Sequence, residues 1–265
     1  MVLDYADHGS LRNYLNTNYD KLSWHIKLRD LSRIAHGLDE IHKKELIHRD
    51  LHIGNILSFS DTYSNVSRIR ITDMGLCKPA DYNKSENTNN NGVYGVLPYI
   101  APEILRGQNY TKAADVYSFG IIMYEVISGL PPYHDVSHDK DLAIKICLGL
   151  RPRFNIKVPQ LIVHLIKRCL DANPLNRPTA EELNVILFTW YMDSDIELKK
   201  QIKEAEEINN NLSTSNTILP TSLETHSEAI YTSRLLNFNE LPEPKNSDDY
   251  YKQNDNIISE KCSGN

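Results

Sequence analysis

The sequence lacks a long uninterrupted hydrophobic run. Its longest apolar stretch, Phe119–Leu130, is broken by Glu125 and Gly129. This stretch is also far shorter than the roughly 20 apolar residues that a helix needs to cross a bilayer. The sequence therefore predicts no membrane span, and it predicts that this stretch is a buried core helix.

The sequence also lacks an excess of basic charge and any cysteine-pair motif. The sequence has 29 Lys and Arg against 35 Asp and Glu, which gives a net charge of -6. Lys and Arg do not cluster into a basic stripe anywhere along it. A general nucleic-acid binder needs such a stripe, so we expect no nucleic-acid partner. Cys77, Cys147, Cys169 and Cys262 form no CxxC pair and no zinc spacing. We expect reduced, mostly buried thiols in a cytoplasmic protein.

Composition divides the chain into two parts. Residues 1–191 hold most of the apolar periodicity, whereas residues 192–265 are rich in Asn, Ser, Glu and Lys. We expect a folded domain over the first part and a polar, low-complexity tail over the second. Glu/Lys pairs at helical spacing predict a partly formed helix over Asp195–Asn210. Beyond Leu212 we expect disorder.

Helical periodicity dominates the first part of the chain. Ser23 can cap a helix that runs to about Lys44, and two short β-rich pieces follow at Ile56–Phe59 and Ile69–Thr72. The other expected helices are Ser10–Leu15, Ala113–Ser128, Leu142–Leu148, Leu161–Leu170 and Thr179–Trp190. The predicted fold class is mainly α, a helical bundle with short β-hairpins.

Three motifs follow one another within this predicted frame. The string His48-Arg49-Asp50-Leu51-His52-Ile53-Gly54-Asn55 lies between the long helix and the first β piece. Asp73-Met74-Gly75 and then Ala101-Pro102-Glu103 come later. The series resembles the protein-kinase motif set HRDxxxxN, DFG and APE. One triplet alone would be weak, but the order and the helix–loop–hairpin context are specific. The resemblance covers about residues 1–191 and looks most like the tyrosine-kinase-like group.

The resemblance implies roles for the residues of the first two motifs. Asp50 would accept the proton of the substrate hydroxyl, and Asn55 and Asp73 would bind Mg²⁺ through oxygen atoms. Thr72 would line the nucleotide site just before the metal-binding aspartate. His52 is a further catalytic candidate, because it can donate a hydrogen bond although it is mostly neutral at pH 7. The implied cofactors are ATP and Mg²⁺, and the implied substrate is a protein.

The opening residues resemble the hinge of a kinase. Leu3 falls at the gatekeeper position, and the Asp4 carbonyl and Ala6 amide would face the adenine. Ser10 would lie near the ribose, and Leu57 would form the floor under the adenine. These residues are therefore candidates for nucleotide binding.

The resemblance also implies structural and regulatory contacts. Glu103 would pair with Arg177 as a buried ion pair, and Asp115 would accept hydrogen bonds from the catalytic-loop backbone. Arg49 would bind a phosphate on the activation segment, which would make an upstream activating kinase a partner. The candidate acceptors there are Tyr82, Ser85, Thr88 and Tyr94.

Three parts of the family pattern do not occur in residues 1–265: the glycine-rich loop, the strand lysine and the helix glutamate. We therefore expect the N-terminal β-lobe to be largely absent and the chain to be a truncated form with impaired activity. Leu51-His52 resembles tyrosine-kinase-like enzymes, which favours Ser/Thr as acceptors. A non-catalytic kinase-like scaffold module stays open as the alternative. The missing lysine favours it, whereas Asp50, Asn55 and Asp73 argue against it.

Overall fold

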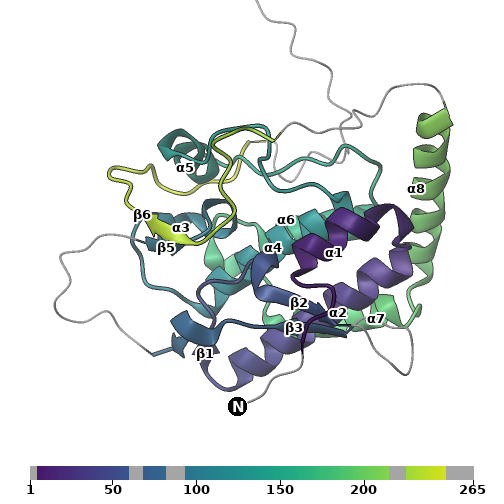
Figure 1. Cartoon of the computed structure of the whole chain (residues 1–265), viewed down its shortest axis with the longest axis horizontal. Coiled ribbons are helices and arrows are strands. Elements are labelled where there is room, and N and C mark those ends of the chain that lie inside the picture. Colours follow the sequence, from purple (N-terminus) through teal and green to yellow (C-terminus); the bar gives the residue numbers. More distant parts are fainter. Residues whose placement is uncertain (1–4, 60–67, 82–92, 215–224, 249–265) are drawn as a thin grey trace, which may run out of the picture.

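Helices make up most of the fold. The computed structural model describes residues 5–59, 68–81, 93–214 and 225–248 (Figure 1). The α-helices are α1 (Leu11–Asn18), α2 (Trp24–Lys43), α3 (Pro102–Leu105), α4 (Lys112–Ser128), α5 (Lys140–Cys147), α6 (Gln160–Cys169), α7 (Ala180–Tyr191) and α8 (Ile196–Thr214). Short 3-10 turns are η1 (Tyr19–Lys21), η2 (Ile53–Asn55), η3 (Met74–Leu76), η4 (Leu97–Tyr99) and η5 (Pro174–Asn176). This arrangement confirms the predicted helices, with ends that differ by a few residues.

Helix α4 forms the centre of the core. Fifteen of its residues, from Ala114 to Ser128, are buried, as expected for a helix that is apolar on all sides. It packs against α6 at Gly120, where an added Cβ would lie 2.7 Å from Cys169. Glycine at this position therefore permits the close approach of the two helices. The free thiols of Cys147 and Cys169 are buried around this core.

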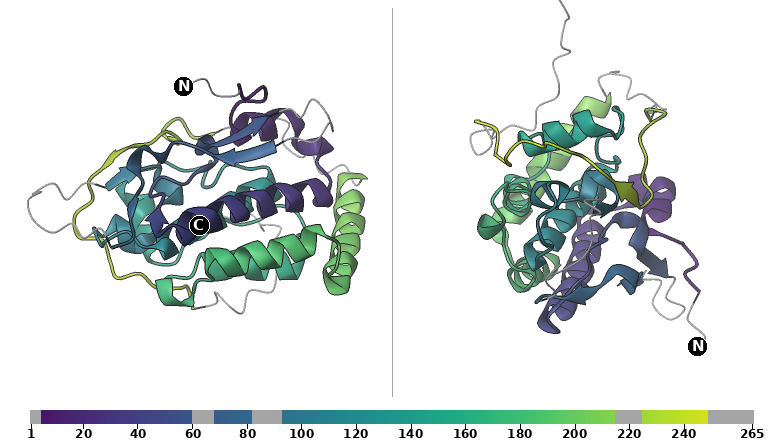
Figure 2. Two further views of the ribbon diagram at one scale, coloured as in Figure 1. Left: turned by 90° about the horizontal axis from the view of Figure 1, so that it is seen from below. Right: turned by 90° about the vertical axis from the view of Figure 1, so that its left-hand side faces the viewer.

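Helices α2 and α7 pack along each other on one side of α4 (Figure 2). The Ser23 side chain accepts from the backbone N–H of Ile26 and caps α2, as predicted. The start of α7 has a capping box, in which the Thr179 side chain and the Glu182 side chain each accept from the other residue's backbone N–H. Local sequence thus defines where both helices begin.

The strands form three two-stranded antiparallel pairs. Their bounds are β1 (Leu46–Ile47), β2 (Ile56–Phe59), β3 (Arg68–Ile71), β4 (Lys78–Pro79), β5 (Val93–Gly95) and β6 (Arg234–Leu236). The β2–β3 hairpin, with Ile56 opposite Ile71, matches the two predicted β pieces. The pairs β1–β4 and β5–β6 were not predicted. Together these strands hold the ends of the loops that carry the motifs.

The part of the chain after residue 192 is more ordered than we expected. Helix α8 stands across the end of the bundle, at the side opposite β5 and β6 (Figures 1 and 2). Residues 225–248 run along α5, α3 and β5, with Leu236 and Leu241 buried. The prediction of disorder is therefore wrong for these residues, because their backbone pairs with β5 and a few apolar anchors are buried. Residues 215–224 and 249–265 lie outside the described residues.

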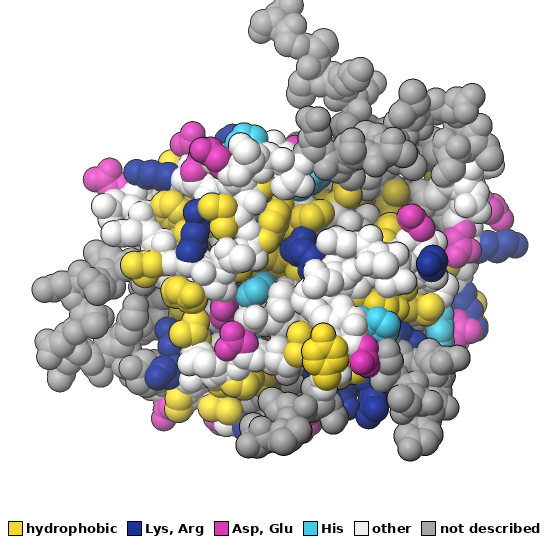
Figure 3. All heavy atoms as spheres, viewed as in Figure 1, with side chains coloured by type: hydrophobic (Ala, Val, Ile, Leu, Met, Phe, Trp, Pro, Cys, Tyr) yellow, Lys and Arg dark blue, Asp and Glu magenta, His cyan; other side chains and the backbone are white. Residues whose placement is uncertain are grey.

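The surface carries apolar and basic side chains close together, and the helices are those of a domain without a membrane-spanning segment in its described part. On the face that carries β5, β6 and α5, hydrophobic and basic side chains lie side by side (Figure 3). Within the described ranges, no helix combines the length and the apolar character that crossing a membrane requires.

Candidate active site

The loop that carries Asp50 is held by a buried carboxylate. Asp115, near the start of α4, accepts from the backbone N–H groups of His48 at 2.8 Å and Arg49 at 2.9 Å. The Nε2 atom of His42 lies 2.9 Å from the same carboxylate. The predicted contact of Asp115 with the catalytic-loop backbone is confirmed. It fixes Arg49 at φ 72°, a left-handed conformation that costs free energy for a residue other than glycine.

Asn55 connects this loop to the segment that ends at Asp73. Its amide nitrogen donates to the backbone carbonyl of Asp50 at 3.0 Å. Its own backbone carbonyl accepts from the N–H of Thr72 at 2.8 Å and from the Thr72 hydroxyl at 2.9 Å. The ring of His48 lies 3.0 Å from the Thr72 carbonyl. Thr72 therefore fixes the distance between the two motifs.

The oxygen atoms of Asn55 and Asp73 fit a hard cation. Asn55 uses its amide nitrogen on Asp50, which leaves its amide oxygen for another partner. Asp73 is exposed, has φ 58°, and accepts one hydrogen bond, from the Gly75 N–H at 3.3 Å. In the part of the chain that the structure describes, no group of three or more His, Cys, Asp or Glu side chains could hold a metal. A two-ligand site of this kind suits Mg²⁺, which usually takes one or two protein ligands together with water and phosphate oxygens.

His52 has a defined tautomer in this loop. Its Nδ1 atom accepts from the Gly54 N–H at 3.1 Å, so in the neutral ring Nε2 carries the hydrogen. That Nε2 lies 3.8 Å from an Asp50 carboxylate oxygen. Burial lowers the pKa of His52, although the Asp50 carboxylate acts in the opposite direction. The ring is therefore a neutral hydrogen-bond donor beside Asp50.

A serine hydroxyl from the end of the chain lies on the Asp50 carboxylate. The Ser233 hydroxyl is 2.8 Å and 3.0 Å from the two Asp50 oxygens and 3.3 Å from His52 Nε2. Sequence reasoning missed Ser233. The run Tyr231-Thr232-Ser233-Arg234-Leu235-Leu236 joins hydroxyl and apolar residues within a polar tail, but nothing in its composition indicates contact with Asp50.

The predicted nucleotide-binding residues are partly described. Leu3 and Asp4 lie outside the described residues. Ser10 pairs with Leu57 through an isolated β-bridge, which brings the first described residues to the edge of β2. The Ser10 side chain accepts from the Asn13 N–H at 3.4 Å and caps α1, while the carbonyl of Ala6 accepts from Gly9. The roles of these residues toward adenine and ribose stay predictions.

The surroundings of Arg49 are those of a guanidinium with spare hydrogen-bonding capacity. It stacks on the ring of Tyr110, with its central carbon 4.6 Å from the ring centre. Its buried Nε has no hydrogen-bond partner among the described residues. Of the predicted phosphate acceptors, Tyr94 is described and exposed. The acceptors outside the described residues are Tyr82, Ser85 and Thr88.

The predicted ion pair below the site is present. Both terminal nitrogens of Arg177 donate to the Glu103 carboxylate, at 2.6 Å and 2.8 Å. Arg177 also donates to the backbone carbonyls of Asp171 and Ala113, both at 2.9 Å. The pair ties the helix after the activation segment to the segment before α7.

Comparison with known families shows which family the chain belongs to. The family model described as "Protein tyrosine and serine/threonine kinase" matches residues 1–187. The chain belongs to this protein kinase family. The match covers the Asp50 loop, the Asp73 segment and the Glu103 helix of the kinase domain.

Curated relatives agree with the family. Three proteins of Dictyostelium discoideum are named "Probable serine/threonine-protein kinase". One is 30% identical over 205 residues, which is 73% of this chain and 11% of the relative. The relative named gdt4 is 33% identical over 185 residues (69% and 11%), and roco5 is 31% identical over 197 residues (68% and 7%). The kinase domain described here thus spans about a tenth of the length of these relatives.

Proposed function

We propose that this kinase domain transfers the γ-phosphoryl group of ATP to serine or threonine hydroxyls of proteins. The observation that carries the proposal is the position of the Ser233 hydroxyl, an aliphatic alcohol, which lies 2.8 Å from one carboxylate oxygen of Asp50. A hydrogen bond of this length is what a general base needs in order to take the hydroxyl proton. The names of the curated relatives support the same acceptor class.

Each residue of the site has a task in this proposal. Asp50 orients the acceptor hydroxyl and takes its proton, while Asn55 holds Asp50 in place and offers an oxygen to the metal together with Asp73. His52 donates to the acceptor oxygen, which leaves the hydroxyl proton for Asp50. When bound, Mg²⁺-ATP supplies the phosphoryl group, and the metal neutralises the charge that develops on the phosphate oxygens.

The wider assignment is also part of the proposal. We propose a tyrosine-kinase-like domain in which residues 1–191 form the hinge and the C-terminal lobe and residues 192–265 form a tail. We further propose a cytoplasmic location and a role in signal transduction. Residues 1–265 contain no glycine-rich loop and no strand lysine to hold the phosphates of ATP. The 265 residues alone should therefore transfer phosphate at least ~100-fold more slowly than a chain that includes those parts.

The test uses the full-length gene product that contains these residues, with Mg²⁺-ATP and peptide acceptors. Asp50→Asn and Asp73→Asn should each lower turnover at least ~100-fold while the circular dichroism spectrum stays unchanged. Asp20→Asn, which changes an exposed carboxylate on η1, is the matched control and should keep turnover. If the unmodified protein folds but transfers no phosphate to any acceptor, the non-catalytic scaffold alternative replaces this proposal.

We also propose that an upstream kinase activates the protein through a phosphate bound by Arg49. The buried Nε of Arg49, which has no hydrogen-bond partner in the described ranges, supports an anion at this position. Phosphopeptide mapping of residues 76–96, together with Arg49→Ala, tests the idea. If the active protein carries no phosphate there, or if Arg49→Ala leaves activation unchanged, this regulatory proposal is wrong.

A further inference from the structure

We infer that the C-terminal segment, residues 226–246, occupies the groove for protein substrates, and that Ser233 is a phosphorylation site which the kinase modifies on its own chain. The inference rests on the proposed function, because the site must transfer phosphate for Ser233 to receive it. Four features of the structure support it: backbone pairing, the hydrogen bonds at Ser233, the contacts of the flanking side chains, and a separate anchor for the end of the segment.

The backbone of the C-terminal segment is held as a peptide substrate would be. Strand β6 pairs antiparallel with β5, and Gly95 lies opposite Arg234, the residue after Ser233. Adding an edge strand is a common way to bind an extended peptide. Gly95 has φ 150°, and an added Cβ there would lie 3.4 Å from Asp50 Oδ1. An added Cβ would come within 3.1 Å of Ile100 Cδ1, so the positive φ and the tight packing on Ile100 favour glycine at this position of β5.

The directions of the hydrogen bonds at Ser233 are those expected for a hydroxyl that accepts a phosphoryl group. His52 Nε2–H donates to Ser233 Oγ, because Nδ1 already accepts from Gly54. The Ser233 hydroxyl must then donate its own proton toward Asp50. In the reaction, Ser233 Oγ forms a bond to the γ-phosphorus as the bond to the bridging oxygen breaks, and the hydroxyl proton passes to Asp50. The electron pair of the broken bond stays on the leaving nucleoside diphosphate.

The side chains on either side of Ser233 are each held by contacts with the rest of the domain. The Tyr231 ring lies under the Arg12 guanidinium at 4.6 Å, and the Tyr231 hydroxyl donates to the carbonyl of Pro132 at 3.0 Å. Arg234 donates to the carbonyl of His138 at 2.5 Å. Leu236 is 5% exposed. These contacts set one register, in which Ser233, and not its neighbour Thr232, reaches Asp50.

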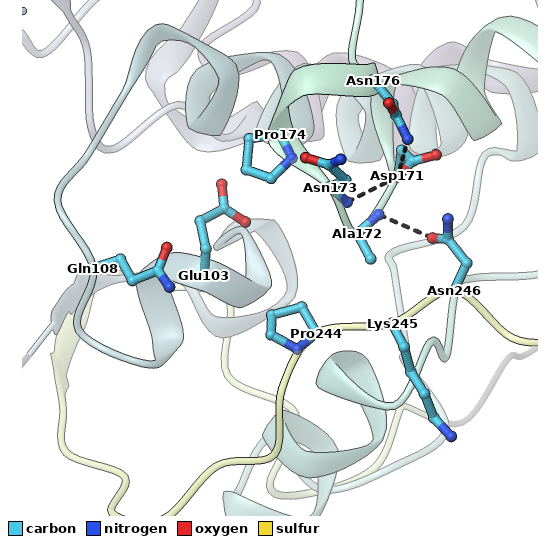
Figure 4. Close-up of a pocket in the computed structure, with 10 residues that line it drawn as sticks. All are labelled: Glu103, Gln108, Asp171, Ala172, Asn173, Pro174, Asn176, Pro244, Lys245 and Asn246. Carbon is cyan, nitrogen blue, oxygen red and sulfur yellow. Dashed lines mark hydrogen bonds between the residues drawn. The ribbon is translucent and has the colours of Figure 1, made fainter.

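The end of the C-terminal segment is fixed at a distance from the catalytic loop. Arg106 pairs with Glu243, and the backbone N–H of Lys245 donates to the carbonyl of Cys147 at 2.9 Å. Asn246 accepts from the Ala172 N–H at 2.9 Å, at the rim of a cavity of about 380 Å³ between the segment and residues 171–176 (Figure 4). The anchor keeps Ser233 tethered near Asp50. A tethered group has an effective concentration on the order of millimolar, which favours transfer within one chain over transfer between chains.

Phosphorylation should then weaken the contact that made it possible. A phosphoserine carries nearly two negative charges at pH 7 and would lie directly on the Asp50 carboxylate. Like charges at this distance repel, so β6 should leave β5 while the anchor at Glu243–Asn246 holds. Phosphate on Ser233 would therefore open the groove for other substrates.

The first experiment maps phosphate in the full-length gene product after incubation with Mg²⁺-ATP. We expect phosphate on Ser233, lost in Ser233→Ala and kept in Ser233→Thr. Thr232→Ala is the matched control, because it removes an adjacent exposed hydroxyl that does not reach Asp50. The first-order rate of incorporation should not change as the protein is diluted, since the acceptor belongs to the same chain. A peptide acceptor added to the same tubes measures transfer independently of Ser233.

The second experiment needs no phosphate transfer. Tyr94→Cys with Leu235→Cys places two thiols on directly opposite, exposed positions of β5 and β6. Under mild oxidation this pair should form a disulfide, whereas Val185→Cys with Leu235→Cys, which uses an exposed position on α7, should not. Adding Ser233→Glu to the Tyr94/Leu235 pair should lower the disulfide yield.

The outcomes separate the two ideas. Phosphate on the added peptide but none on Ser233 overturns the inference and leaves the proposed function intact. The inference is also overturned if the Tyr94→Cys, Leu235→Cys variant forms no disulfide. It is likewise overturned if the first-order rate of phosphate incorporation at Ser233 rises with protein concentration. No transfer to any acceptor, with the disulfide still formed, contradicts the proposed function, and the inference falls with it.

Discussion

The ion pair between Glu103 and Arg177 allows a quantitative test of what holds the lobe together. Both side chains are almost fully buried, and Arg177 makes two hydrogen bonds to the carboxylate and two to backbone carbonyls. Arg177→Met leaves the Glu103 charge buried without a partner, which typically costs about 3–5 kcal/mol of unfolding free energy. For a domain of this size each kcal/mol lowers the melting temperature by about 2–4 °C, so we expect a fall of roughly 6–20 °C.

The double variant Glu103→Leu, Arg177→Met removes the stranded charge. It should recover part of the lost stability, because the carbonyl of Asp171 still loses its Arg177 donor at a cost of about 1–3 kcal/mol. Urea unfolding followed by circular dichroism measures all three proteins, and the m-value should not change. Lys199→Met, which breaks an exposed pair with Asp193, is the control and should cost less than about 1 kcal/mol. If the double variant is as unstable as Arg177→Met, the uncompensated charge is not the cause.

Three further changes test other parts of the domain. Burial lowers the pKa of Lys27 to about 8, so the folded state binds fewer protons than the unfolded state between pH 8 and about 10.5. Compared with a Lys27→Met variant, the unmodified protein should therefore gain stability as the pH rises through that window, and identical pH dependence of the two proteins in urea titrations would contradict this. Thr179→Ala removes the capping box of α7 and should cost about 1 kcal/mol in the same unfolding assay, with Thr189→Ala as an exposed control. Asp115→Asn should lower kcat of the full-length gene product and leave the KM for peptide nearly unchanged, since it disturbs the catalytic loop; an unchanged kcat would refute that role.

Most of the helical frame could be predicted because local signals define it. The cap at Ser23 and the capping box at Thr179 each act within one helical turn, and the apolar surface of α4 is set by the residues of that helix alone. The pairs β1–β4 and β5–β6 could not be predicted in the same way. Their strands are two or three residues long and pair with segments far along the chain, so neither periodicity nor turn residues indicate them.

The same distinction between local and long-range signals applies to the candidate site. Asp50, Asn55 and Asp73 lie in motifs with fixed spacing, and the structure brings Asn55 onto Asp50 and Thr72 onto Asn55. Ser233 comes from a segment whose composition predicts disorder. Composition averages over many residues, whereas a few buried apolar anchors and one paired strand are enough to order this segment against a preformed surface.

Strand β5 has a consequence for recognition that goes beyond this chain. It is three residues long, and its partner β6 supplies its antiparallel pairing. Any other protein that takes the place of β6 must present unpaired backbone in an extended conformation, because a helix offers no free N–H or C=O groups to an edge strand. The same acceptor sequence should thus be ignored inside a folded helix and accepted in an unfolded loop or terminus. Conformation of the acceptor, as much as its sequence, would then decide which proteins this domain can modify.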